Sequence, residues 1–325
     1  MEEKRKWRWG VNRWFVLLFI ILNVIAAQYY APVLPHIQLP AEVTWHIGGF
    51  AWTNTLWAMI IADVIILLIA FIVNRAATSG DMVPSGFSGA VEALLEVIYN
   101  LTESTAGKWA RTIFPFFATI TLYVLIVNWM ELIPGVDSIG IIEHAHGEGH
   151  AVEQISNGLA TILPGTGEYA LVPYVRVLST DLNFTVALAL ISVFMTQVIG
   201  VRALGISYFT KFINVGGIFS RPVFGVIDFG VGLLEMVSEI SKILSFSFRL
   251  FGNIFAGSVL LFVIGTLVPV FAQSIFLLLE FFVGLIQAFV FGMLTMVFMS
   301  QATHGHGGGH EEHAEEHPVE SPATP

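Results

Sequence analysis

The sequence contains no cysteine and few charged residues. Without cysteine the chain forms no disulfides, thiolate metal sites or cysteine nucleophile. Charged residues make up 12% of its 325 residues, about half the share that is typical of a soluble domain. The sequence patterns of phosphate-binding loops, zinc proteases and serine hydrolases are also missing. The composition therefore argues against a self-contained enzyme.

Hydrophobic residues are abundant instead. They form 55% of the chain, and the mean hydropathy is +0.77. This composition predicts an all-α, multi-pass membrane protein. We expect a membrane domain over 51–300, preceded by an anchor or signal with an external segment (1–50) and followed by a disordered cytoplasmic tail rich in His and Glu (301–325). The predicted spans, each long enough to cross about 30 Å of hydrocarbon, are 52–74, 113–133, 182–201, 222–266 and 271–299, with an amphipathic interfacial helix near 90–104.

The N-terminus combines basic residues with an apolar run from Trp14 to Ala27. This order is typical of a cleaved signal peptide and equally of a retained signal anchor. Of the 14 Lys and Arg residues, eleven fall in segments assigned to the cytoplasm and one, Arg176, falls outside. Basic residues in short loops favour the cytoplasmic side. We therefore expect both termini in the cytoplasm if the first apolar segment is retained.

Arg249 lies inside a long apolar run. A guanidinium keeps its charge at any accessible pH, and a charge in lipid is costly enough to mark a functional site. None of the residues three or four positions away is acidic. We therefore expect its counter-charge to come from another element or another subunit.

The long helix predicted around Arg249 carries an ordered polar stripe. At about 100° per residue, six of its polar side chains fall within roughly 80° of one another. Glu239 and Lys242 have the spacing of an intrahelical ion pair. Ser238 and Ser245 flank the stripe, whose members are Asp228, Glu235, Glu239, Lys242, Arg249 and Asn253.

In the last predicted span, Gln273, Glu280 and Gln287 are seven residues apart and share a face. A turn near 267–269 places Gln287 at about the depth of Arg249, and Glu280 nearer the outside. The layout predicts two proton-accessible regions separated by a fixed positive charge. Weaker candidates lie near the outer ends of other spans: Asn128, Glu131 and Asn183. For Asp63, inside the span 52–74, a hydrogen bond to a neighbouring helix and a role in ion passage both remain open.

The segment Ser-Phe-Arg-Leu-Phe-Gly-Asn-Ile-Phe-Ala-Gly (247–257) closely resembles the signature of subunit a of F-type ATP synthase. Blocks at 77–80, 128–134, 176–183 and 285–291 also resemble that family, in the same order, so the resemblance covers roughly 50–300.

This resemblance implies a proton-translocating stator subunit of the bacterial inner membrane, which is not catalytic by itself, with a long, steeply tilted C-terminal hairpin packed against a c ring. Arg249 would face the ring carboxylates, Glu235 and Ser238 would serve the cytoplasmic half-channel together with Glu239, and Asn253 and Gln287 would serve the outer one. The implied partners are the c ring, the peripheral-stalk b subunits, the rest of the complex and the lipid bilayer. No cofactor, metal or nucleic acid is expected.

Two positions depart from the family pattern. Ser258 stands where the family commonly has an acid or histidine, and Glu280 stands where a histidine is common. The ionisable group therefore lies on the other helix of the hairpin, and we expect Glu280 to serve the outer half-channel alone.

Histidine-rich segments suggest an alternative, a metal-ion transporter, because imidazole clusters bind zinc and copper. The segments include His144, His146 and His150, and His304 to His313 near the C-terminus. All ten histidines lie outside the predicted spans, so no path of ligands crosses the membrane. A purely structural scaffold, the third possibility, leaves Arg249 unexplained.

Overall fold

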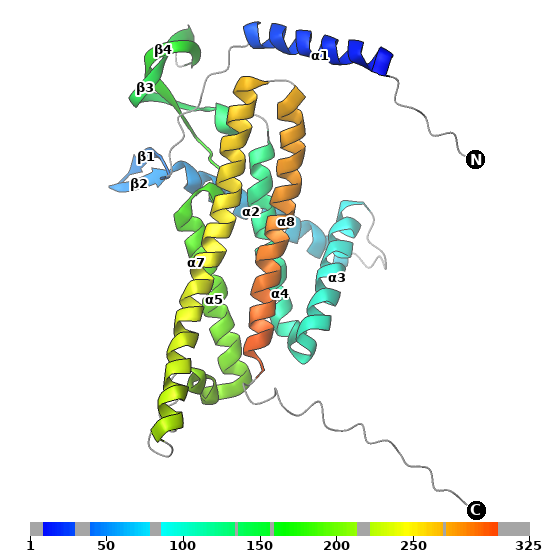
Figure 1. The fold of residues 1–325 in the computed structure, drawn as a ribbon, viewed down its shortest axis with the longest axis vertical. Coiled ribbons are helices and arrows are strands. Elements are labelled where there is room, and N and C mark those ends of the chain that lie inside the picture. The colour runs from blue at the N-terminus through cyan, green and yellow to red at the C-terminus, as the bar shows by residue number, and fades with distance from the viewer. Residues whose placement is uncertain are drawn as a thin grey trace, which may run out of the picture. The chain divides into compact units, whose positions relative to one another are not determined.

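The computed structural model describes residues 9–29, 40–78, 86–133, 136–156, 159–212, 222–268 and 271–304 (Figure 1). Helices dominate these residues. Five stretches are long and apolar enough to cross a membrane, and α2, α4, α5, α7 and α8 lie in them. The prediction of an all-α, multi-pass membrane protein is confirmed. The helices are α1 (Trp9–Tyr29), α2 (Asn54–Thr78), α3 (Phe87–Ala106), α4 (Ala110–Trp129), α5 (Leu182–Leu204), α7 (Pro222–Leu267) and α8 (Phe271–Ala302).

Two glycines with a left-handed backbone conformation follow the ends of helices. Gly107 follows α3 with φ +51° and Gly205 follows α5 with φ +64°. This left-handed conformation suits glycine and closes a helix C-terminus. After Gly205 the chain forms the 3₁₀ helix η5 (Gly205–Lys211), which carries Lys211 to its place beside α7.

The structure also contains two antiparallel hairpins that were not predicted from the sequence. One pairs β1 (Val43–Ile47) with β2 (Phe50–Thr53), and the other pairs β3 (Gly140–Ser156) with β4 (Leu159–Pro173). The first had a recognisable signal, since Gly48 and Gly49 with φ +57° and +89° supply the positive φ that a two-residue hairpin turn needs. The second hides in a stretch rich in Gly and His, and its register shifts several times.

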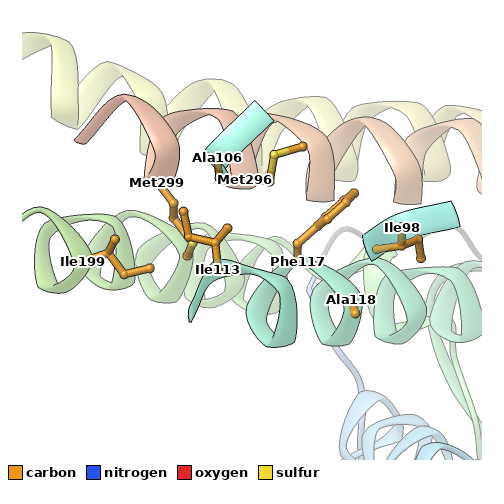
Figure 2. Close-up of a cluster of buried hydrophobic side chains, with 8 residues drawn as sticks. All are labelled: Ile98, Ala106, Ile113, Phe117, Ala118, Ile199, Met296 and Met299. Atoms are coloured by element: carbon orange, nitrogen blue, oxygen red, sulfur yellow. The ribbon is translucent and has the colours of Figure 1, made fainter. Parts of the chain in front are cut away.

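The chain divides into two compact units, each with its own core. Unit 1 comprises Met1–Ala93, Thr119–Ala187 and Phe246–Gly292, and unit 2 comprises Leu94–Ala118, Leu188–Ser245 and Met293–Pro325. The core of unit 1 holds Ala58, Ala62, Val127, Met130 and Leu178. In unit 2, residues of α3, α4, α5 and α8 form one buried cluster (Figure 2): Ile98, Ala106, Ile113, Phe117, Ala118, Ile199, Met296 and Met299.

The predicted tail lies almost wholly outside the described residues. The helix α8 continues to Ala302, and only Thr303 and His304 of the segment beyond it are described. At the other end, α1 covers most of the N-terminal apolar run. The alternatives of signal peptide and retained anchor stay predictions.

Candidate ion-translocation site

Arg249 lies on the exposed side of α7. Residues adjacent to it in the helix are buried: Ser247 and Leu250 are 0% exposed and Phe246 is 3% exposed. The ring of Phe246 packs on Phe291 of α8, with centroids 5.2 Å apart. Arg249 is thus an exposed charged residue next to a buried contact between α7 and α8.

One helical turn beyond Arg249, two amides join the hairpin helices. Asn253 Nδ2 donates to Gln287 Oε1 over 2.8 Å. Gln287 is 4% exposed, and its Nε2 has no hydrogen-bond partner among the described residues. A buried amide with an unused donor is costly in a purely apolar setting, so this point of the hairpin is suited to a polar ligand or water.

Glu280 of α8 packs directly on Gly257 of α7. A Cβ at Gly257 would overlap the Glu280 carboxylate, so only glycine leaves room for it. Glu280 is 6% exposed, and within the described part of the chain its Oε1 receives no hydrogen bond. The carboxylate is therefore buried with an acceptor oxygen still available.

A second acid reaches the same place from the end of α4. Glu131, in the 3₁₀ helix η2 (Met130–Leu132), forms a short hydrogen bond through Oε1 with the hydroxyl of Ser258. Its Oε2 is buried and has no partner among the residues described. Glu280 lies within electrostatic range of Glu131. Ser258 therefore contacts an acid from another helix at the position where the sequence departs from its family pattern.

Side chains of α4 hold α8 in register. Asn128 Nδ2 donates to the carbonyl oxygen of Gly284 over 3.1 Å, and its Oδ1 accepts from Ser179 Oγ over 2.7 Å. The indole of Trp129 stacks on Phe281 with centroids 4.6 Å apart. Asn128 thus both donates and accepts a hydrogen bond in contacts that hold α4 against other parts of unit 1.

Two other predicted polar residues do not join this group. Asn183 is exposed at the start of α5, where its backbone N–H donates to Asp181 Oδ1 over 2.9 Å. Asp63 of α2 is hydrogen-bonded with Tyr123 of α4. For Asp63, the contact supports the reading of a bond between neighbouring helices. We call the remaining set the Arg249 cluster: Arg249, Asn253, Gly257, Ser258, Glu280, Gln287 and Glu131.

Unit 2 contains a second polar group, which we call the Glu239 cluster: Gln197, Tyr208, Lys211, Glu235, Glu239 and Lys242. At its centre, Glu239 is 8% exposed. Its Oε1 accepts from Lys242 over 2.9 Å and from Lys211 over 3.2 Å, and its Oε2 accepts from Gln197 over 3.0 Å. Three elements therefore meet on one carboxylate.

The other predicted residues of α7 in unit 2 are less enclosed. The carboxylate of Glu235 lies 3.5 Å from the ammonium of Lys211, and the Glu235 side chain is 28% exposed. Ser238 is exposed. Sequence reasoning brought Glu235, Glu239 and Lys242 together by their spacing. It missed Lys211, Gln197 and Tyr208, because they approach α7 from 24 to 42 residues away in sequence with no periodic signal.

The histidine-rich hairpin shows ring packing rather than a ligand set. The imidazole of His144 stacks on Tyr169 with centroids 4.6 Å apart. In the described ranges, no group of three His, Asp or Glu side chains is placed to hold a metal ion. Nothing in the part of the chain that the structure describes favours a metal-ion transporter.

Comparisons with known proteins agree on one family. The family model described as ATP synthase A chain matches residues 56–300. ATP synthase subunit a 1 of Photobacterium profundum is 34% identical over 216 residues, which cover 62% of this chain and 67% of that protein. ATP synthase subunit a of Tolumonas auensis is 28% identical over 234 residues, covering 70% and 74%. That of Aliarcobacter butzleri is 29% identical over 207 residues, covering 63% and 70%. Both clusters lie entirely within the matched residues.

Proposed function

The chain belongs to the ATP synthase A chain family, and we propose that its two polar clusters line the two half-channels of the proton path. It is the proton-translocating stator subunit of an F-type ATP synthase, and it is not catalytic by itself. It is a multi-pass membrane protein and part of the F-type complex. The proposal rests on one observation: Arg249 is exposed on α7, and the hairpin beside it contains the buried polar side chains of Gln287 and Glu280.

Arg249 supplies the fixed charge that the mechanism needs. A guanidinium cannot lose its proton in the membrane, so it repels a proton and attracts a carboxylate. On the exposed side of α7 it faces the c ring, where it draws each ring carboxylate into the deprotonated state. A proton therefore cannot pass directly from one half-channel to the other and must travel on the ring.

The Arg249 cluster forms the outer half-channel. Its buried carboxylates, Glu280 and Glu131, each keep one oxygen without a hydrogen bond in the described chain, where a proton or water can bind. Asn253 and Gln287 continue this path toward Arg249. Asn128 supports the path by holding α8. Asn183 lies outside the path at the start of α5, where Asp181 accepts a hydrogen bond from its backbone N–H.

The Glu239 cluster belongs to the cytoplasmic half-channel. Glu235 is its more accessible acid and Glu239 the buried one, and we assign the exposed Ser238 of α7 to the same half-channel. This orientation follows from the basic residues, which favour the cytoplasmic side. It places both termini in the cytoplasm if the N-terminal segment is retained, in the inner membrane of a bacterium.

The length of α7 supports a tilted arrangement at the ring. Its 46 residues make a helix of about 70 Å at about 1.5 Å per residue, which is roughly twice the hydrocarbon thickness. A helix this long tilts or runs along the membrane surface. We propose that it lies steeply tilted against the c ring, while the b subunits of the peripheral stalk hold the chain still.

Cysteine cross-linking tests which face of α7 meets the ring, since the chain has no cysteine of its own. Ala256 lies seven residues from Arg249 on the same exposed side, whereas Ile254 is 1% exposed. With a cysteine on the ring helix that bears the carboxylate, Ala256→Cys should cross-link on oxidation, stop ATP-driven pumping, and recover on reduction. Ile254→Cys should do neither. Cross-linking from Ile254→Cys alone would overturn the proposed facing.

A further inference from the structure

Lys211 occupies a position that the proton path described above does not use. It ends η5, and its Nζ lies 3.2 Å from Glu239 and 3.5 Å from Glu235. The ammonium also lies over the rings of Tyr208 and Phe212, 4.5 Å from each centroid. A cation between two carboxylates and two aromatic faces is held by both kinds of attraction. Its side chain is 12% exposed.

Packing at the backbone fixes the same segment. A Cβ at Gly232 of α7 would overlap the carbonyl oxygen of Phe212, so glycine lets η5 approach α7 closely. A Cβ at Gly200 of α5 would overlap the ring of Tyr208. The Tyr208 hydroxyl donates to Gln197 Oε1 over 2.7 Å, and Gln197 donates onward to Glu239. The end of η5 is thus joined to α5 and α7 through one connected network.

The two acids of this network have different surroundings. The carboxylate of Glu239 accepts hydrogen bonds from two ammonium groups and one amide. Glu235 has the longer contact with Lys211 and is more exposed. Glu239 is therefore tied to its neighbours, while the Glu235 carboxylate stays accessible to water.

We propose that Lys211 is a positioning residue that fastens η5 to α7 through Glu239 and so holds Glu235 at the mouth of the cytoplasmic half-channel. A proton that leaves the ring binds the Glu235 carboxylate and passes from it to cytoplasmic water. Glu239 takes no part in this transfer and remains the anchor for Lys211 and Lys242. This inference rests on the proposed function, because it assumes that the Glu239 cluster lines a proton path.

The test measures ATP-driven proton pumping per assembled complex in inverted membrane vesicles. Lys211→Met keeps an apolar chain over the two rings but removes the ammonium, and it should lower pumping by about 3- to 10-fold. Lys211→Arg should keep most of the activity. Lys108→Met, at an exposed lysine of the same unit, is the control and should pump normally.

Normal pumping per complex in Lys211→Met would overturn the inference, including the case in which only the amount of complex falls. So would a Lys211→Arg variant that pumps no better than Lys211→Met, because the positive charge would then be unimportant. If the variants of Lys211 behave as the control while Arg249→Ala still abolishes pumping, the inference fails and the proposed function stands. Normal pumping in Arg249→Ala would contradict the proposed function instead.

Discussion

The two clusters handle buried carboxylates in opposite ways. Glu280 in unit 1 and Glu239 in unit 2 are almost equally buried, at 6% and 8% exposure. Glu239 is contacted by two ammonium groups and an amide, whereas Glu280 packs on a glycine and keeps one oxygen without a hydrogen bond among the described residues. Burial therefore does not distinguish these acids, and their partners do.

This difference in partners affects what each carboxylate can do. Releasing a proton from an acid without a cation beside it creates a buried charge, so such an acid responds to a nearby guanidinium or to water. Glu239 instead bonds two ammonium groups, and removing one partner from such a buried pair is costly. Under the proposed function, the Arg249 cluster exchanges protons, and the Glu239 cluster holds helices together around an accessible Glu235.

The strongest way to break this comparison is to remove the acid of Glu280. Glu280→Gln keeps the shape of the side chain but cannot carry a proton, so ATP-driven pumping should fall by about 10-fold or more. The matched control is Gln273→Glu, which adds an acid seven residues away on the same face, beside Gly265, and should change pumping much less. Equal, small effects in both variants would make Glu280 a packing residue.

A smaller effect is expected from crowding Glu280 without changing it. Gly257→Ala introduces a Cβ that overlaps the carboxylate, and the shifted side chain should lower pumping by about 3-fold. Gly230→Ala, elsewhere on α7, where a Cβ meets nothing within 4 Å, serves as the control and should leave pumping unchanged. If both variants pump alike, the close contact of Gly257 with Glu280 is unimportant for transfer.

In the Glu239 cluster, the same kind of change should mainly cost stability. Glu239→Gln leaves Lys211 and Lys242 facing a neutral amide, and breaking a partly buried ion pair of this type costs about 1–3 kcal/mol. Thermal dissociation of the purified complex should occur a few degrees lower. Unchanged thermal stability, together with a loss of pumping as large as that of Glu280→Gln, would erase the distinction between the two clusters.

The smallest effect is expected outside the membrane, at Asp137 in unit 1. Burial raises the pKa of Asp137 to about 6, against the opposing charge of Arg176. Because this pKa lies above the usual value for aspartate, its contribution to stability is complete below about pH 4 and is lost as the pH rises through 6. Asp137→Asn should remove this dependence, so that the midpoint of thermal unfolding changes by about 2 °C less between pH 5 and 7. An unchanged pH dependence would exclude Asp137 as its source.

Local sequence patterns predicted the helices and the pairing within α7. Hydrophobic length is set by the bilayer, so apolar runs identify membrane helices without knowledge of their neighbours. The spacing of Glu239 and Lys242 predicts their contact because helix geometry alone brings them together. The turn near 267–269 predicted that Gln287 lies at about the depth of Arg249. In the structure Gln287 pairs with Asn253, four residues further along α7.

Contacts between distant segments could not be predicted in this way. The hydrogen bond of Ser258 with Glu131 joins residues 127 positions apart, and Lys211 reaches Glu239 from a separate 3₁₀ helix. Neither contact has a periodic signature, because both depend on how helices pack. The β3–β4 hairpin was missed because its glycines and histidines are not typical strand residues.

The measurement that tests the account most directly is ATP-driven proton pumping in inverted membrane vesicles carrying Arg249→Ala. The amount of assembled complex is measured in the same vesicles, so that a loss of assembly is not mistaken for a loss of transport. If Arg249 is the fixed charge that separates the two half-channels, the variant assembles but builds no proton gradient. An assembled variant that pumps at the normal rate would contradict the account.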